Sequence, residues 1–242
     1  MMRLRYTVPN AFTALSLLLG VSSIVTTQLG DLETAAWIIV WCGLLDVMDG
    51  VSARLLKATS DFGAEFDSMA DLVSFGVAPA VLMLNAGLQI GGIETGSLPF
   101  WLLLVSIGVF TLAGAMRLAR FNIVSESPGR GWFSGVPITA AGGGLVSSAV
   151  LVLIHQPDIA ASLPLHLYMP VFMFVLALLM ISRLRFPKAV VRDKLAVNLF
   201  QGAFVVVFYY CGITRSYPEL LLGAGILILI SGIIAGRMTR PS

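Results

Sequence analysis

The sequence predicts an all-α, polytopic integral membrane protein with about eight transmembrane helices, and three observations support this fold class. First, 57% of the 242 residues are hydrophobic and only 12% are charged, whereas a soluble domain carries roughly 25% charged residues. Second, the apolar residues form long uninterrupted stretches. Third, the basic residues fall on alternate loops. These features exclude a soluble globule, a disordered chain and a coiled coil, and a net charge of +2 is too small to indicate nucleic acid as a partner.

Eight stretches are long enough to cross a bilayer, which needs about 20 apolar residues per helix. The first lacks a small-residue cleavage site, so we expect a retained helix and not a signal peptide. We expect one domain over residues 1–242, with the last two helices peripheral. Cys42 and Cys211 lie in apolar stretches and are expected to pack, not to form a disulfide. The predicted helices lie near residues 9–29, 34–54, 63–88, 98–121, 136–155, 164–182, 196–213 and 217–237.

The distribution of positive charge predicts the orientation. With eight crossings, 14 of the 15 basic residues fall on one side, and only Arg215 falls on the other. Because cytoplasmic loops retain Lys and Arg, both termini are expected in the cytoplasm, with the protein in the cytoplasmic membrane. The residues of the basic side are Arg3, Arg5, Arg54, Lys57, Arg117, Arg120, Arg130, Arg183, Arg185, Lys188, Arg192, Lys194, Arg237 and Arg240.

Small and aromatic residues fit the same picture. The triplet Gly142-Gly143-Gly144, with Gly223 and Gly225, is expected to allow close helix packing and not to break helices. Aromatic residues near predicted helix ends are typical of the membrane interface; they are Trp101, Trp132, Tyr168 and Tyr217. His155 and His166 are predicted on the side opposite the basic loops, away from any site there.

Four carboxylates lie within the second and third predicted helices. Asp49 follows Asp46 at the third position along the chain, and Asp71 follows Asp67 at the fourth, so each pair projects from one helix face. Two antiparallel helices with a short connection would bring all four together. Buried carboxylates are costly in a membrane and mark functional sites. Oxygen ligands favour Mg²⁺ or Mn²⁺, and four carboxylates suffice for two ions.

The residues between the two pairs suit a phosphate ligand. Gly50, Ala53 and Gly63 leave room beside the helix backbones, and Arg54, one turn after Asp49, carries a guanidinium suited to phosphate. The simpler interpretation is that the acids pair with Arg54 and Lys57 at helix ends. That interpretation leaves two of the four acids without a basic partner.

The string Asp46-x-x-Asp49-Gly50-x-x-Ala53-Arg54, then eight residues, then Gly63-x-x-x-Asp67-x-x-x-Asp71 resembles the motif of the CDP-alcohol phosphotransferase family. The resemblance implies that fold, with the motif core at 46–71. It implies metal binding by the four aspartates and proton acceptance by Asp71, which makes Asp71 the catalytic base. It also implies that a CDP-linked lipid binds at Pro9, Asn10, Asp49, Gly50, Ala53, Arg54, Ser60 and Gly63, and that the protein is a homodimer.

Other segments resemble the phosphatidylserine synthases of this family. They are residues 67–80, Arg117–Asn122, Phe133–Pro137 and Ser182–Pro187. Ile138-Thr139 departs from the pattern, where a second proline or a small residue is expected near Pro137. The resemblance implies CDP-diacylglycerol and L-serine as substrates. A guanidinium can bind the serine carboxylate through two hydrogen bonds; the candidate serine-binding residues are Ser74, Arg117, Arg120, Asn122, Arg183 and Arg185.

Several alternatives remain open from sequence. The arginines could simply anchor helix ends, and Ser74 and Asn122 could serve in packing. The acceptor could be inositol phosphate, glycerol phosphate or choline, and the lipid could be an archaeal ether lipid. A cation transporter would use the aspartates but gives no role to Gly50, Ala53, Arg54 and Gly63 at their spacing. A purely structural membrane scaffold leaves the four carboxylates unexplained.

Overall fold

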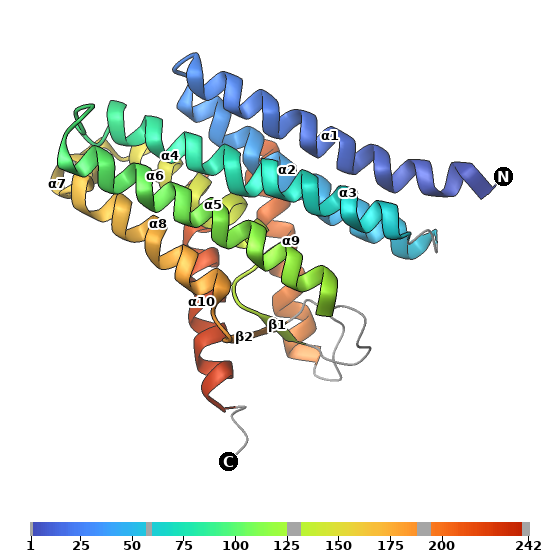
Figure 1. The fold of residues 1–242 in the computed structure, drawn as a ribbon. Coiled ribbons are helices and arrows are strands. Elements are labelled where there is room, and N and C mark those ends of the chain that lie inside the picture. Colours follow the sequence, from blue (N-terminus) through green and yellow to red (C-terminus); the bar gives the residue numbers. More distant parts are fainter. Residues whose placement is uncertain (1, 57–59, 125–131, 188–194, 239–242) are drawn as a thin grey trace.

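The computed structural model describes residues 2–56, 60–124, 132–187 and 195–238, and these residues are mostly helical (Figure 1). The helices are α1 (Met2–Gln28), α2 (Leu32–Leu55), α3 (Asp61–Asp71), α4 (Ala78–Gln89), α5 (Leu98–Val124), α6 (Ser147–His155), α7 (Pro157–Ser162), α8 (Leu165–Ile181), α9 (Leu195–Thr214) and α10 (Pro218–Met238). Two π-helical segments, η1 (Leu72–Val77) and η2 (Thr139–Val146), precede α4 and α6. Two short strands are β1 (Trp132–Ser134) and β2 (Arg185–Pro187).

Each of the eight predicted membrane stretches coincides with a helix or a continuous helical run. Within the described ranges, four helices are long and apolar enough to cross a membrane: Thr7–Gln28, Leu32–Ala53, Asp61–Gln89 and Leu98–Ile123. Shorter apolar helical segments of 10–17 residues overlap the last four predicted stretches: Thr139–His155, Leu165–Ile181, Val205–Thr214 of α9 and Pro218–Ile230 of α10. The prediction of a helical membrane protein is therefore confirmed, and the short helix α7 is an addition to it.

Helices α1 and α2 form a hairpin whose turn is set by local chemistry. Gly30 adopts a φ of +91°, which favours glycine. Asp31 precedes α2, and its Oδ1 accepts a hydrogen bond from the Thr34 backbone N–H at 3.0 Å, as an N-cap residue does. That hydrogen bond stabilises the carboxylate and lowers the pKa of Asp31. The α1–α2 connection thus has both a glycine for the turn and a cap for the helix.

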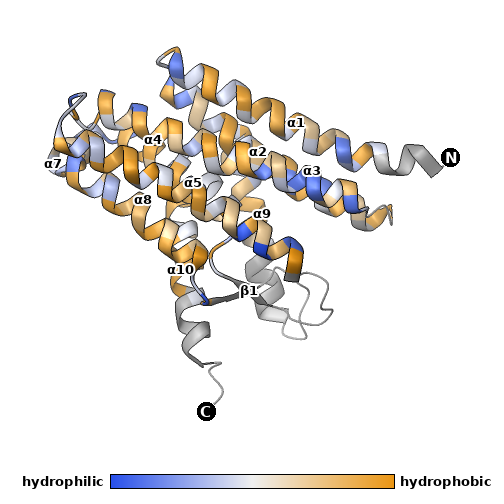
Figure 2. Ribbon diagram, in the orientation of Figure 1, coloured by the Kyte–Doolittle hydropathy of each residue, from blue (hydrophilic) through white to orange (hydrophobic). Residues whose placement is uncertain are grey.

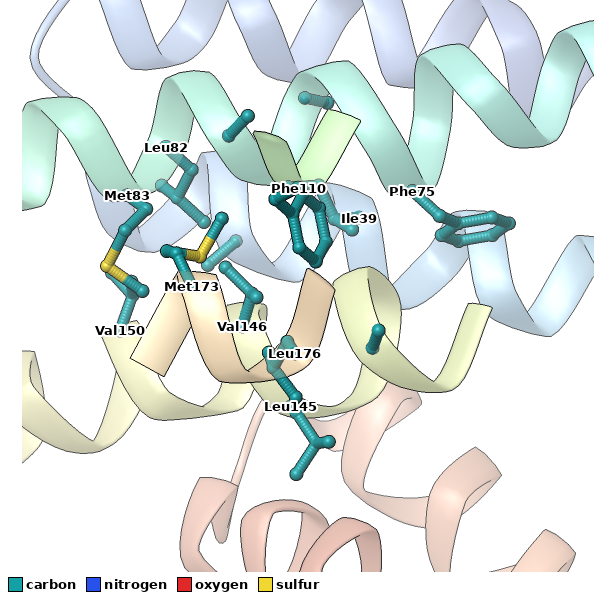
Figure 3. Close-up of a cluster of buried hydrophobic side chains, with 14 of the residues drawn as sticks. Ile39, Phe75, Leu82, Met83, Phe110, Leu145, Val146, Val150, Met173 and Leu176 are labelled. Atoms are coloured by element: carbon teal, nitrogen blue, oxygen red, sulfur yellow. The ribbon is translucent and has the colours of Figure 1, made fainter. Parts of the chain in front are cut away.

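The core lies among α2, η1, α4, α5, η2, α6 and α8. Figure 3 shows Phe75 of η1, Phe110 of α5 and Met173 of α8 together with Ile39 of α2 and Leu145 of η2. All five are at most 1% exposed. The cluster therefore ties the helix that carries Asp46 and Asp49 to the run that carries Asp67 and Asp71.

The outer surfaces of α1, α5 and α8 are apolar. Leu18, Val105, Leu112 and Phe174 are between 45% and 63% exposed. Figure 2 shows α5 and α8 hydrophobic (orange) over most of their length, whereas α3 carries several hydrophilic (blue) residues. A helix that is apolar on both its buried and its exposed faces fits a lipid environment.

The two π-helical segments pack closely through glycine. A Cβ at Gly142 would overlap the backbone carbonyl oxygen of Phe75 in η1, and one at Gly143 would lie 3.0 Å from the Phe75 ring. One at Gly225 of α10 would lie 2.7 Å from Leu145, whereas Gly144 and Gly223 face open space. The packing role is confirmed for Gly142, Gly143 and Gly225.

Strands β1 and β2 form a short antiparallel pair in which Phe133 is opposite Phe186. The pair joins the connection after α5 to the connection after α8. Gly135 follows β1 with a φ of +78°, and its N–H donates to the Leu184 carbonyl at 2.8 Å. Two segments singled out from sequence, 133–137 and 182–187, therefore lie side by side, although no strand was predicted there.

Helices α9 and α10 pack along one side of the bundle (Figure 1). The Tyr209 hydroxyl donates to the Leu44 carbonyl at 2.9 Å, and Trp41 Nε1 donates to the Gly212 carbonyl at 2.6 Å. Arg215 lies over the Trp41 ring, 4.4 Å from its centroid.

The cysteines Cys42 and Cys211 are buried and unbridged, which confirms their predicted packing role.

Candidate metal and substrate site

Three of the four predicted carboxylates converge. Asp46 and Asp49 of α2 and Asp67 of α3 each offer one oxygen, and these oxygens lie within 4.8 Å of one another. Asp49 is 7% exposed. Because acidic oxygens at this spacing repel one another unless a cation or protons intervene, and because they are hard ligands, the three residues could hold a divalent metal ion.

Asp71 lies one helical turn beyond Asp67, at the end of α3. Within the described part of the chain, the converging group contains the other three aspartates and not Asp71. Its charge nevertheless interacts with those of Asp46, Asp67 and Asp49. Asp71 thus lies beside the group of three, without an oxygen that shares the mutual 4.8 Å separations of the other three.

A cavity of about 160 Å³ opens next to the carboxylates. Its walls are formed by residues 9–13 of α1, by the second half of α2 and by the start of α3. Seven of the eight residues predicted from sequence to bind the CDP-lipid line it. The lining residues are Pro9, Asn10, Thr13, Asp49, Gly50, Ala53, Ser60, Gly63, Ala64 and Asp67.

The glycines in the cavity wall have two different roles. A Cβ at Gly50 would meet nothing within 4 Å, so Gly50 keeps the cavity wide. A Cβ at Gly63 would lie 3.1 Å from Ser60 Oγ and 3.3 Å from Asn10 Oδ1, so Gly63 allows α3 to approach α1. Ser60 caps α3, because its Oγ accepts the Gly63 N–H at 3.0 Å. The predicted Arg54 belongs to α2, but its side chain lies outside the described residues.

Two threonine hydroxyls reach the carboxylates from elements outside the motif. Thr13 of α1 donates to Asp49 Oδ2 at 2.9 Å, and Thr139, the first residue of η2, donates to Asp46 Oδ2 at 3.5 Å. Thr13 is 4% exposed. The two residues of α2 that converge on the candidate metal position therefore each have a hydroxyl partner.

Arg117 of α5, a candidate serine-binding residue, is 7% exposed and lies inside the bundle. Its charge interacts with those of Asp71 and Asp46, and its guanidinium carbon lies 6.0 Å from the centroid of the Phe121 ring. Among the candidate serine-binding residues whose side chains the structure describes, Arg117 is the one whose charge interacts with Asp46 and Asp71. A buried guanidinium near carboxylates is suited to binding a small anion.

The other candidate serine-binding residues have protein partners or lie at the surface. Arg120 donates to the Ile181 carbonyl at the end of α8, at 3.2 Å. Asn122 donates to Ser68 Oγ at 3.0 Å and to Glu65 at 3.3 Å. Ser74 is fully buried, and its hydroxyl donates to the Ser16 carbonyl of α1 at 3.0 Å. Arg183 is exposed, and the side chain of Arg185 is outside the described residues.

Sequence reasoning missed Thr13, Ala64 and the hydroxyl of Thr139. Thr13 follows Pro9 by four residues and Asn10 by three, so the helical period places it on the same face. That spacing could have identified it. The contact of Thr139 with Asp46 joins residues 93 positions apart, and the only signal in the sequence was its departure from the expected residue type.

Comparisons with known proteins show which family the sequence matches. The model of the CDP-alcohol phosphatidyltransferase family matches residues 6–234. A CDP-diacylglycerol–serine O-phosphatidyltransferase of Helicobacter pylori is 36% identical over 235 residues, which cover 95% of this chain and 90% of the relative. Proteins of the same name from Bacillus subtilis and Methanocaldococcus jannaschii are 33% and 36% identical, over 81% and 69% of this chain and 97% and 70% of the relatives.

Proposed function

The chain belongs to the CDP-alcohol phosphatidyltransferase family, and from this premise we propose that it is an enzyme that transfers the phosphatidyl group of CDP-diacylglycerol to the hydroxyl of L-serine. The products are phosphatidylserine and CMP. One observation carries the proposal: the three converging carboxylates stand beside a cavity lined by seven of the residues expected to bind the CDP-lipid. The names of the bacterial and archaeal relatives support serine as the acceptor.

In the proposed reaction, the serine hydroxyl oxygen forms a bond to the β-phosphorus of the CDP-lipid. The bond between that phosphorus and the oxygen of the CMP phosphate breaks, and CMP leaves with the electron pair. The hydroxyl proton passes to the carboxylate of Asp71, which acts as general base. The position of Asp71, one turn beyond Asp67 and outside the converging group, suits a residue that exchanges protons.

Asp46, Asp49 and Asp67 would hold the metal, with Asp71 as a fourth ligand where two ions bind. Mg²⁺ or Mn²⁺ fits a set of carboxylate oxygens. When bound, such ions neutralise the diphosphate and stabilise the charge that develops on the departing phosphate.

The cavity would take the nucleotide side of the CDP-lipid. Gly50 leaves space beside α2, while Pro9 and Asn10 line the cavity from α1 and would contact the ligand there. Ala53 and Arg54 would approach the phosphates from the last turns of α2. The acyl chains would remain in the bilayer, since the exposed faces of α1 and α5 are apolar.

Arg117 would bind the serine carboxylate. Its guanidinium is buried close to Asp71, and the planar fork can donate a hydrogen bond to each oxygen of a carboxylate. In this proposal, Arg117 of α5 holds the carboxylate of serine, and the hydroxyl of the same small molecule then lies next to Asp71 of α3. Arg120, Asn122 and Ser74 would then act in holding the helices, in line with their hydrogen bonds to the protein.

We further propose that the protein resides in the cytoplasmic membrane, with both termini and the site on the cytoplasmic side. The distribution of 14 basic residues supports this orientation. In Figure 1, the start of α1, the end of α2 and the end of α5 lie at the same end of the bundle. A homodimer is proposed from the family alone.

An acceptor panel tests the proposal. The purified protein is reconstituted in lipid with CDP-diacylglycerol and Mg²⁺ or Mn²⁺, and each of L-serine, inositol phosphate, glycerol phosphate and choline is added separately. Release of CMP and the lipid product are measured together. The proposal expects phosphatidylserine from L-serine and no product from the others. Preferential use of another acceptor would refute the serine assignment while leaving the phosphotransfer chemistry intact.

A further inference from the structure

We propose that Thr13 and Thr139 are positioning residues that fix the carboxylates of Asp49 and Asp46 for metal binding. The inference rests on the proposed function, because it concerns the metal site of that reaction. Neither threonine belongs to the aspartate motif, and they approach it from α1 and η2, two elements that each pack against α2.

The hydroxyl of Thr13 has two acceptors within reach. It lies 2.9 Å from Asp49 Oδ2 and 3.2 Å from the carbonyl of Pro9. A hydroxyl has a single proton to donate, and a bond to a carboxylate is stronger than a bond to a neutral carbonyl. The shorter distance and the charge both favour Asp49. Thr13 thus donates across the α1–α2 interface, where it is 4% exposed.

Thr139 plays the corresponding role for Asp46, over a longer distance of 3.5 Å. It begins η2, a π-helical segment, and such segments are frequent at functional sites. The close contact of Gly142 with the Phe75 carbonyl fixes η2 against η1. The backbone that carries Thr139 is therefore set by packing, and its hydroxyl is directed at Asp46 by the fold.

A hydroxyl bond to one carboxylate oxygen has a specific consequence for a metal site. It limits rotation of the carboxylate about its χ angles, and the remaining lone pairs stay available to a cation. Loss of such an outer partner typically weakens metal affinity or activity by about 10- to 100-fold. The same hydroxyl also satisfies a carboxylate that is buried in a helix interface, in the case of Asp49.

The test measures Mn²⁺ binding to the purified protein in detergent, without nucleotide. The free Mn²⁺ is quantified by electron paramagnetic resonance. We expect Thr13→Val to raise the dissociation constant by about 10-fold or more. Thr13→Ser, which keeps the hydroxyl, should stay close to the wild type, and Thr139→Val should show a smaller rise. Thr26→Val is the matched control, because Thr26 also lies in α1 and its hydroxyl donates only to the Ser22 carbonyl of its own helix.

A kinetic measurement on the same variants complements the binding experiment. The Mn²⁺ concentration for half-maximal CMP release should rise in Thr13→Val, while the rate at saturating Mn²⁺ recovers much of the wild-type value. A purely structural defect would lower the rate at every metal concentration. Thermal unfolding without metal identifies a variant that has lost its fold, and Thr13→Ala then replaces Thr13→Val, since it removes the same donor without adding apolar bulk.

The outcomes separate the inference from the function on which it rests. Equal Mn²⁺ affinity in wild type, Thr13→Val and Thr139→Val would overturn the inference alone. Unchanged Mn²⁺ affinity with weaker CDP binding in Thr13→Val would also overturn it, because Thr13 would then be a substrate contact. A wild-type protein that binds no Mn²⁺ and releases CMP without metal would overturn both the inference and the proposed metal site.

Discussion

The contact between η1 and η2 supplies a prediction whose size follows from the structure. A Cβ at Gly142 would overlap the backbone carbonyl of Phe75, and the Cγ of Pro79 would lie 2.9 Å away. Backbone atoms cannot swing aside as a flexible side chain can, so Gly142→Ala must separate the two segments by a distance on the order of 1 Å. Inserting a methyl group into a packed core typically costs about 1–3 kcal/mol.

Gly144→Ala is the matched control, two residues away in the same π-helical segment. Its Cβ would meet nothing within 4 Å. Both substitutions gain the same helix propensity, about 1 kcal/mol relative to glycine, and this gain cancels in the difference. We therefore expect Gly142→Ala to be about 1–3 kcal/mol less stable than Gly144→Ala.

The assay is thermal unfolding in detergent, with both variants and the wild type in the same micelles. Because η2 also carries Thr139, Gly142→Ala should in addition weaken Mn²⁺ binding. Equal unfolding temperatures for Gly142→Ala and Gly144→Ala would refute the packing argument. Such a result would mean that η1 and η2 are not in close contact in the folded protein.

Three further predictions concern the site and the helix packing. Chelation of divalent ions should abolish CMP release, and added Mg²⁺ or Mn²⁺ should restore it; turnover in excess chelator would contradict the metal assignment. Arg117→Lys should raise the KM for serine by about 10-fold, because lysine cannot make the two parallel hydrogen bonds of a guanidinium to a carboxylate. The KM for CDP-diacylglycerol should change less. An unchanged serine KM, matching that of the control Arg120→Lys, would remove Arg117 from the acceptor site. Trp41→Phe should lower stability by about 1 kcal/mol through loss of the hydrogen bond to the Gly212 carbonyl. Thermal unfolding should show no comparable loss for the control Trp101→Phe, at an exposed tryptophan.

Much of the helical arrangement could be predicted from sequence because the membrane restricts the choices. Long apolar stretches in a bilayer must be helical, since every backbone polar group has to be satisfied within its own segment. The stretch predicted at 34–54 is α2 at Leu32–Leu55, and that at 98–121 is α5 at Leu98–Val124. The motif spacing also sufficed to bring Asp46, Asp49 and Asp67 together, because period and helix direction determine which residues share a face.

The remainder depended on contacts between distant segments, which periodicity does not describe. The pairing of Phe133 with Phe186 requires the ends of α5 and α8 to meet. The contact of Thr139 with Asp46 depends on the register of η2 against α2. Asn122 was predicted to bind substrate. The hydrogen bonds that its side-chain amide donates to Ser68 and Glu65 depend on how α5 crosses α3. Side-chain hydrogen bonds of this kind follow from tertiary packing.

The most direct test of the central claim compares wild type with Asp71→Asn in lipid, measuring CMP release and phosphatidylserine formation in the presence of CDP-diacylglycerol, L-serine and Mg²⁺ or Mn²⁺. Asparagine keeps the size of the side chain but cannot accept the serine proton, and general base catalysis contributes about 100- to 10,000-fold to a rate. We expect the wild type to form one phosphatidylserine for each CMP, and Asp71→Asn to be slower by at least about 100-fold. Near wild-type turnover in Asp71→Asn would contradict the account.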